Sequence, residues 1–196
     1  MLKTKIAVLV SGGGTNLQAL IDAQNSGIIK SGAIGLVISN KENAYALTRA
    51  KENGIKSLYI KKDADFEKKL IKAIEEEKID IMVLAGFLVI LSEDFVKRYP
   101  RRIINVHPSL IPSFCGDGFY GLKVHEAALG RGVKLTGATT HFVNEITDGG
   151  EIIMQKAVEI KPGDTPETLQ KRVMEEAEWK ILPLSVEKIS QEFLKG

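Results

Sequence analysis

Ile103-Ile104-Asn105-Val106-His107-Pro108-Ser109 is the most informative segment of the sequence. A run of β-branched residues leads directly into polar residues and a proline, which is typical of a parallel strand that presents side chains at its carboxyl end. Asn105 and His107 are two residues apart, so along a strand they project to the same side. An amide donor beside an imidazole can stabilise an oxyanion and move a proton. Taken alone, the stretch fits equally well a hydrogen-bonded core histidine and an asparagine that caps the strand end.

The pattern around this stretch predicts an α/β fold. Short apolar runs, typical of strands buried on both faces, alternate with helical patterns, and this favours a parallel sheet with right-handed crossovers. The runs expected as strands are residues 6–10, 34–38, 57–60 and 79–84. After Gly132 the runs 135–143 and 151–160 have no helix between them, which predicts an antiparallel pair. We therefore expect one domain over residues 1–196, a Rossmann-like, mostly parallel twisted sheet with helices on both faces and an antiparallel C-terminal extension.

The last helix is expected to begin at Thr165, because a capping residue followed by Pro166 is a typical helix start. Leu169, Val173, Ala177 and Ile181 would lie on its inward stripe. Pro183 should kink or interrupt this helix, because proline lacks the backbone donor and its ring meets the preceding turn.

Composition excludes several classes of function. Lys+Arg of 27 against Asp+Glu of 25 gives a net charge of +2, so no charge excess indicates nucleic acid. One cysteine, Cys115, indicates a reducing compartment, and the three scattered histidines have no metal-ligand spacing. No signal peptide is visible, and the longest apolar run, residues 81–91, is too short to span a bilayer. We expect a cytoplasmic protein with no metal, no membrane and no nucleic-acid partner.

A glycine-rich turn follows the first strand, Ser11-Gly12-Gly13-Gly14-Thr15-Asn16, and opens a helix that stops near Gly27. Backbone donors and the helix N-terminus there favour a phosphate, although a merely tight turn remains the alternative. A dinucleotide is not expected, because Leu17 occupies the third glycine position and the second strand ends in Ser39-Asn40 without an acid. No Gly-Lys-Ser/Thr follows, so the loop is not a Walker loop.

Three further segments carry open alternatives. Residues 85–92 form an apolar loop that is either core or the wall of a pocket for a flat aromatic ligand. The glycine-rich segment 113–122 is either a surface loop or a lid, and Cys115 within it has no paired base. Asp148, before two glycines, is either a turn residue or a partner that raises the pKa of His107. His141 is equally ambiguous and could orient Asp148.

Several motifs occur in an order that resembles a known family. They are Ser11-Gly12-Gly13-Gly14-Thr15-Asn16-Leu17-Gln18, Leu84-Ala85-Gly86-Phe87, Ile90-Leu91-Ser92, the stretch from Asn105 to Pro112, His141-Phe142-Val143 and Asp148-Gly149-Gly150. Over nearly its whole length the chain resembles the phosphoribosylglycinamide formyltransferase family of folate-dependent enzymes. The resemblance implies transfer of the formyl group of 10-formyltetrahydrofolate to the amine of glycinamide ribonucleotide in purine biosynthesis. It also implies small-molecule substrates only, and a monomer or a homodimer.

The same resemblance implies the roles of individual residues. The implied catalytic residues are Asn105, His107 and Asp148, with Asp148 keeping His107 protonated. The implied ribotide-binding residues are Gly14, Thr15 and Asn16, which hold the phosphate, and Glu178. The implied folate-binding residues are Leu88, Val89, Ile90, Leu91, Asn144, Glu145, Ile146 and Thr147.

Three positions depart from the family pattern. Val89 stands where well-known members carry an arginine, so a side-chain contact with the folate at this position is in doubt. The loop from Cys115 to Leu122 is longer than in those members. Trp179 replaces a residue that is often histidine, and the alignment around Glu178 is open by about one turn of helix.

Alternative functions include two other folate-dependent enzymes and one non-enzymatic binding protein. A methionyl-tRNA formyltransferase would carry a further basic C-terminal domain, and a formyl-folate hydrolase would carry an additional regulatory domain; we expect neither in this chain. A non-catalytic nucleotide sensor would bind a ribotide without formyl transfer, but the three catalytic residue types are present, which counts against it.

Overall fold

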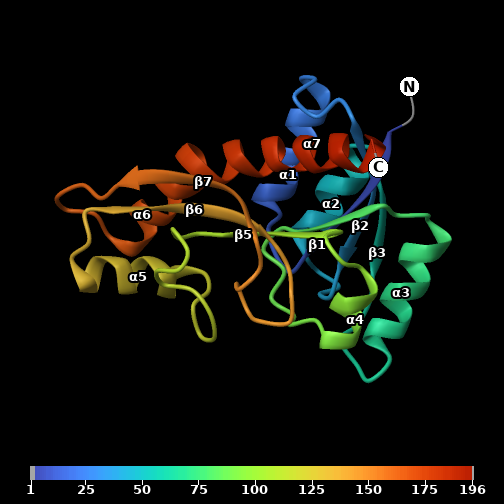
Figure 1. Ribbon diagram of the computed structural model, residues 1–196, viewed down its shortest axis with the longest axis horizontal. Helices are drawn as coiled ribbons and strands as arrows, with labels where there is room; N and C mark the ends of the chain where they lie inside the picture. Colours follow the sequence, from blue (N-terminus) through green and yellow to red (C-terminus); the bar gives the residue numbers. More distant parts are fainter. Residues whose placement is uncertain (1–2, 196) are drawn as a thin grey trace.

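One seven-stranded sheet organises the computed structural model, which describes residues 3–195 (Figure 1). Its strand order is β3-β2-β1-β4-β5-β6-β7. Pairs from β3 to β5 are parallel, whereas β6 is antiparallel to both β5 and β7. The strands are β1 (Thr4–Val10), β2 (Gly32–Ser39), β3 (Lys56–Tyr59), β4 (Ile81–Leu84), β5 (Ile103–His107), β6 (Leu135–Phe142) and β7 (Ile152–Glu159). The predicted mostly parallel sheet with an antiparallel extension is confirmed.

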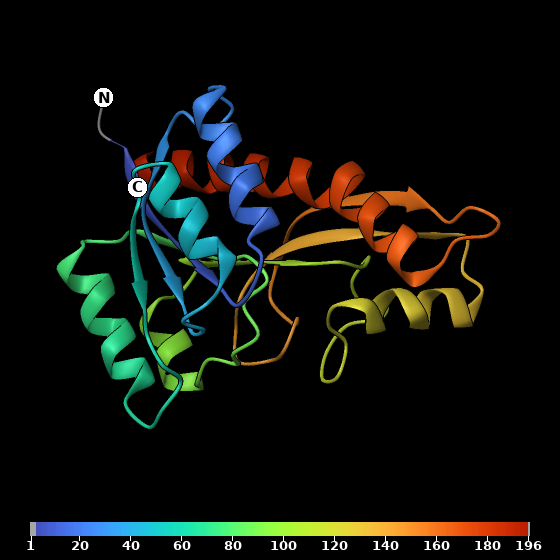
Figure 2. The ribbon, with the colours of Figure 1, turned by 180° about the vertical axis from the view of Figure 1, so that it is seen from behind.

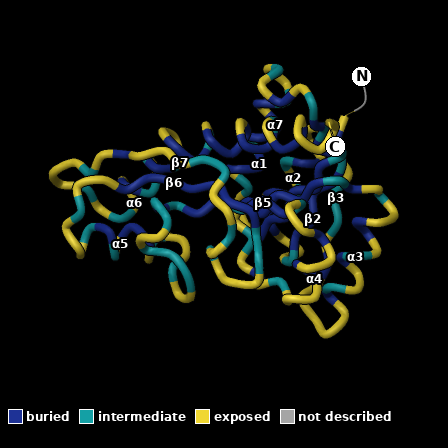
Figure 3. Tube along the Cα trace, viewed as in Figure 1, coloured by how far each residue is buried: buried dark blue, intermediate teal, exposed yellow. Residues whose placement is uncertain are grey.

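Helices cover both faces of the sheet (Figures 1 and 2). Alternate residues of β1 enter different cores: Ile6 and Val8 pack on one face, and Ala7 and Leu9 on the other. Each such isoleucine, valine or leucine contributes about 1.5–3 kcal/mol when fully buried, which is why the strand is apolar at every position from Ile6 to Val10. The first face carries α1 (Thr15–Asn25), α2 (Tyr45–Glu52) and α7 (Trp179–Lys195); the second carries α3 (Phe66–Glu76) and α4 (Glu93–Arg98). Figure 3 shows the buried trace concentrated on the strands and the exposed trace on the outer turns.

The antiparallel extension has a smaller core of its own. Ala138 and Val158 of β6 and β7 pack against Leu169 and Val173 of α6 (Pro166–Val173). The helix α5 (Leu122–Arg131) lies beside α6 at the same end of the molecule (Figure 1). This core holds the C-terminal helical region against β6 and β7, the two strands beyond β5 at this edge of the sheet.

The predicted start of the last helical region is confirmed, but its interior differs from expectation. The Thr165 side chain accepts a hydrogen bond from the Thr168 amide, and Pro166 follows it. The helix then widens into a π-helical turn, Met174–Glu178, and α7 runs through Pro183 without a break. Of the two predicted effects of Pro183, a kink or an interruption, the interruption is contradicted. Trp179, four residues earlier, has ψ −7° instead of a helical value, which turns away the carbonyl that the proline ring would otherwise meet.

The topology fixes where a ligand site can form. The chain runs from β1 outward to β2 and β3 and then crosses back to β4 on the other side of β1. A crevice forms at the carboxyl ends of the strands where the direction of winding reverses. Two backbone hydrogen bonds beyond β1 and β4 hold this edge together, from the Ser11 amide to the Gly86 carbonyl and from the Ala85 amide to the Leu9 carbonyl.

Candidate active site

A cleft of about 680 Å³ opens at the carboxyl ends of β4 and β5, within the size range of small-molecule sites. It brings together side chains from strand ends, from loops and from the C-terminal helical region. The sequence-predicted residues that line it are Thr15, Asn16, Leu88, Val89, Ile90, Leu91, Asn105, His107, Asn144, Glu145, Ile146, Thr147, Asp148 and Glu178. Gly14 is not among its lining residues.

Asn105, His107 and Asp148 converge at the base of the cleft. Both β5 residues line it, as their two-residue spacing requires, and Asp148 reaches them from the loop between β6 and β7. The Asp148 Oδ2 atom lies 3.4 Å from His107 Nδ1, and its Oδ1 atom lies 3.5 Å from Asn105 Nδ2. Asp148 has φ 55°, a left-handed conformation that is uncommon outside glycine, so the tight turn itself aims the carboxylate. Turn residue and carboxylate partner are therefore compatible descriptions of Asp148.

Burial decides the protonation of His107. The ring is nearly inaccessible, and desolvation lowers the pKa of His107 below its usual 6.5. The Asp148 carboxylate and the Phe114 carbonyl favour the imidazolium but do not outweigh burial. Asp148 therefore raises the pKa of His107, as expected, but in this geometry burial outweighs it and favours the neutral imidazole over the protonated ring that the resemblance implies. Burial raises the pKa of Asp148, but hydrogen bonds from His141 and the Gly116 amide, together with the neighbouring histidines, lower it by more, so Asp148 remains a carboxylate.

The segment after β5 folds back over these groups. The Phe114 carbonyl accepts a hydrogen bond from His107 Nε2 at 2.9 Å, and the Gly116 amide donates to Asp148 Oδ2 at 2.9 Å. Phe114 has φ 50°, a sparsely populated conformation for a residue other than glycine, whereas Gly116 adopts its φ of 88° without strain. The Cys115 thiol donates to the Pro112 carbonyl, and burial raises its pKa, which makes it a poor nucleophile. The loop therefore covers both His107 and Asp148 in this structure.

The glycine turn and the C-terminal helical region meet at one side of the cleft. Gly14 caps α1 with φ 73°, and a Cβ there would lie 2.7 Å from Ala46 Cβ, so the turn itself requires glycine. Thr15 and Asn16 begin α1, where unpaired backbone N–H groups and the helix dipole favour an anion. Asn16 Nδ2 donates to Glu178 Oε2 at 2.7 Å. Burial raises the pKa of Glu178, and the hydrogen bond from Asn16 opposes this only in part.

Apolar residues form the outer wall. Val89 is 7% exposed and packs into the core, whereas Leu88 and Ile90 are 59% and 75% exposed at the mouth. Ile146, 68% exposed, belongs to the segment Asn144–Thr147. Exposed apolar side chains at a cleft mouth fit the flat face of an aromatic ligand. The apolar loop is thus partly core and partly cleft wall, as its two sequence readings allowed.

Further lining residues were not predicted from the sequence. Gln170 and Met174 line the cleft together with Glu178. Their spacing of four residues places them on one helix face, and this periodicity was the signal that could have identified them. Phe119 and Tyr120 of the loop also line it, but a loop has no periodic pattern from which such placement can be read.

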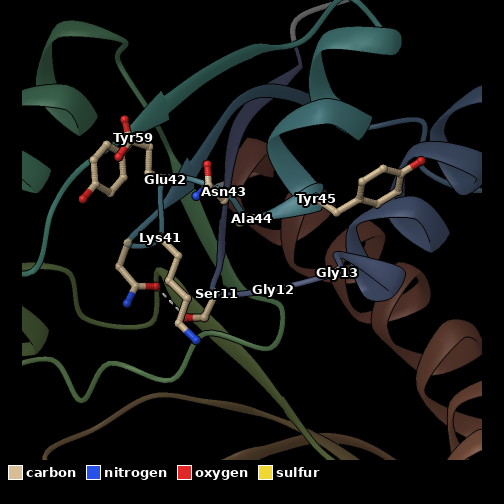
Figure 4. A pocket seen from close by; sticks show the side chains of 10 residues that line it. Ser11, Gly12, Gly13, Lys41, Glu42, Asn43, Ala44, Tyr45 and Tyr59 are labelled. Atoms are coloured by element: carbon tan, nitrogen blue, oxygen red, sulfur yellow. Dashed lines mark hydrogen bonds between the residues drawn. The ribbon is translucent and has the colours of Figure 1, made fainter.

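A second cleft of about 690 Å³ lies on the other side of the glycine turn (Figure 4). Ser11 Oγ donates to Asn40 Oδ1 at 2.7 Å and accepts from the Leu88 amide, so it ties together three segments beyond the strand ends. Tyr45 and Tyr59 stand at opposite ends and are 53% and 41% exposed. Asn40 directly follows β2, where a dinucleotide site would carry an acid.

The described residues, 3–195, contain neither a candidate metal cluster nor a candidate membrane helix. Within that range no group of three or more His, Cys, Asp or Glu side chains is placed to hold a metal ion. In the same part of the chain no helix has the length and apolar character needed to cross a membrane.

Comparisons with known proteins agree on one family. Residues 4–186 match the family described as formyl transferase. The chain is 44% identical over 96% of its length to the human trifunctional purine biosynthetic protein adenosine-3, of which it spans 18%. It is 41% identical over 93% of its length to phosphoribosylglycinamide formyltransferase of Haemophilus influenzae, of which it spans 85%. The crystal structure of phosphoribosylglycinamide formyltransferase from Anaplasma phagocytophilum superposes with a TM-score of 0.89 at 38% identity, covering 97% of this chain and 88% of that one.

Proposed function

We propose a reaction for this site from the premise that the chain belongs to the formyl transferase family, among the phosphoribosylglycinamide formyltransferases. The chain transfers the formyl group of 10-formyltetrahydrofolate to the amine of glycinamide ribonucleotide, a step of purine biosynthesis. One observation carries the proposal: an amide, a neutral imidazole and a carboxylate converge at the base of an open cleft that also contains a helix N-terminus.

The chemistry requires a stabilised oxyanion and a moved proton. The substrate amine attacks the formyl carbon, a new C–N bond forms, and the carbonyl oxygen gains negative charge. The Asn105 amide donates a hydrogen bond to that oxygen. The bond from carbon to N10 of the folate then breaks as the carbonyl re-forms. The proton lost by the attacking amine passes through His107 to N10, so His107 begins and ends the cycle as a neutral ring.

Asp148 stabilises the intermediate imidazolium. Its carboxylate faces His107 Nδ1 at 3.4 Å and raises the pKa of His107 against the effect of burial. His107 is therefore neutral before the reaction but does not pay the full cost of a buried charge when it accepts the proton. In this structure Nε2 carries the ring proton and donates it to the Phe114 carbonyl. The loop must therefore move aside, and the ring proton must shift to Nδ1 beside Asp148, before Nε2 can accept the proton of the substrate amine.

The two substrates approach from different sides. The ribotide phosphate binds the N-terminal turn of α1 at Gly14, Thr15 and Asn16, and Glu178 contacts the glycinamide portion. The folate ring lies between Leu88–Leu91 and Asn144–Thr147. We further propose a single-domain, cytoplasmic enzyme, monomeric or homodimeric, that uses neither metal nor nucleic acid.

A two-substrate assay with glycinamide ribonucleotide and 10-formyltetrahydrofolate tests this function. The wild-type protein should form the formylated product, and His107→Asn should bind both ligands while turning over at least about 100-fold more slowly. Ligand-induced shifts of thermal unfolding verify that the variant is folded and binds. Binding without product formation by the wild type would favour the nucleotide sensor, and a near-normal rate in the variant would remove His107 from the reaction.

A further inference from the structure

We infer that His141 is a positioning residue that fixes the orientation of the Asn105 side-chain amide. The inference rests on the proposed formyl transfer and adds a residue to which that proposal gives no role. His141 stands directly opposite Asn105 in the antiparallel pairing of β5 with β6, so the sheet backbone sets the distance between them.

The tautomer of His141 follows from its backbone contact. Its Nδ1 atom lies 2.8 Å from the Phe142 carbonyl oxygen. A carbonyl oxygen only accepts hydrogen bonds, so Nδ1 carries a ring proton. Nε2 then faces two polar groups, the Asn105 amide nitrogen at 3.2 Å and Asp148 Oδ1 at 3.5 Å. The nearer of the two is a donor, so Nε2 accepts from it with its lone pair. The ring is 2% exposed, so little solvent can compete for that lone pair.

The lone pair selects one orientation of the Asn105 amide. Asn105 Nδ2 lies 3.2 Å from His141 Nε2, and only the nitrogen end of the amide has a hydrogen to donate. The flipped amide would place its oxygen lone pairs against the lone pair of Nε2, which is repulsive in a buried site. His141 therefore holds the amide nitrogen of Asn105 toward the imidazole ring and prevents the side-chain amide from flipping.

This orientation matters because one amide nitrogen serves two acceptors. One N–H of Nδ2 bonds His141, and the second remains for the charge that grows on the formyl oxygen. That second N–H has only a long contact in this structure, 3.5 Å to Asp148 Oδ1. A freely rotating amide would present its oxygen to the oxyanion for part of the time and lose the stabilisation, which is typically worth about 10²- to 10³-fold in rate.

A double-mutant cycle on the full chain tests the coupling. His141→Asn keeps a donor near the Nδ1 position for the Phe142 carbonyl but removes the acceptor at Nε2. It should lower kcat about tenfold or more while each KM changes less than about threefold. In the Asn105→Ala background the same substitution should lower kcat by less than about twofold, because the amide on which it acts is gone. His141→Gln, whose side-chain oxygen can reach the Nε2 position, should recover part of the rate and replaces His141→Asn in the cycle if that variant does not fold.

Several outcomes would overturn the inference. An unchanged kcat in His141→Asn contradicts it, as do losses that add in full to those of Asn105→Ala. Coupling to Asp148→Asn without coupling to Asn105→Ala would show that His141 orients the carboxylate instead. In a protein that transfers no formyl group, nitrogen NMR of His141 still decides: a ring protonated at Nε2 in place of Nδ1 contradicts the tautomer, whereas failed turnover contradicts the proposed function.

Discussion

His107 shows at the scale of one residue how opposing effects set reactivity. Burial lowers its pKa, and the Asp148 carboxylate and the Phe114 carbonyl raise it. Residue type and spacing in the sequence indicated a proton-transfer group, but they could not give the sign of this balance. The desolvation of His107 depends on how deeply the loop buries its ring, and this burial cannot be inferred from any pattern in the sequence.

The pH dependence of kcat/KM follows from this sign. The imidazole must be neutral to accept the amine proton, so activity should be lost on the acid side as His107 becomes protonated, below pH 6.5. Asp148→Asn removes a charge that raises the pKa of His107, and should therefore move this acid limb to still lower pH while slowing the reaction. The free substrate amine titrates identically in both proteins, so its contribution cancels when the two profiles of kcat/KM are compared. The lowered pKa of Asp148 places its own titration further from neutrality, so the limb nearer neutrality belongs to His107. An acid limb that moves to higher pH in the variant would contradict the assignment.

Elements were predicted well where periodicity is strong and poorly where side chains override it. The runs gave every strand of the described sheet within a few residues. Burial on both faces demands apolar residues in the central strands β1 and β4, whereas the edge strands β3 and β7 are largely exposed and mixed in composition. Of the two effects predicted for Pro183, the interruption does not occur, because the π-helical turn Met174–Glu178 changes the helix register just before it. That turn adds no recognisable residue type, so the sequence alone left the position of Glu178 open by one turn of helix.

The loop that follows β5 has the clearest conformational prediction among the elements. Gly116 has φ +88° and donates its amide to Asp148, so Gly116→Ala should strain the closed loop by about 1 kcal/mol. The open population should rise about fivefold, which faster amide hydrogen exchange across residues 113–121 would detect. Gly130→Ala is the matched control, because Gly130 lies within α5 without a positive φ and has open space at its Cβ position. Equal exchange rates in the loop of both variants would contradict the closed-loop geometry.

The distribution of charge matters at the scale of the whole molecule. A net charge of +2 conceals an uneven arrangement, because the described residues that line the main cleft include Asp117, Glu145, Asp148 and Glu178 but no lysine or arginine. Both proposed substrates are anions, with a phosphate on one and the glutamate carboxylates on the other. The phosphate can use backbone donors at α1, whereas the mouth proposed for the folate presents the exposed apolar side chains of Leu88, Ile90 and Ile146 and no lysine or arginine. We therefore expect apolar contact to dominate recognition of the folate.

A cation placed on this rim should change how the enzyme responds to salt. In the wild type, kcat/KM for 10-formyltetrahydrofolate should vary by less than about twofold between low and high ionic strength, because no lysine or arginine lines the cleft to attract the tail. Ile90 is 75% exposed at the mouth, so Ile90→Arg can pair with the glutamate carboxylates without disturbing the core. Its kcat/KM should rise several-fold at low salt and fall back as salt screens the pair. Ile28→Arg, at a residue 48% exposed outside the cleft lining, adds the same charge and should leave the salt profile unchanged. A strong salt dependence already present in the wild type would mean that a cation outside the lining reaches the tail, and apolar contact would then not be the main determinant.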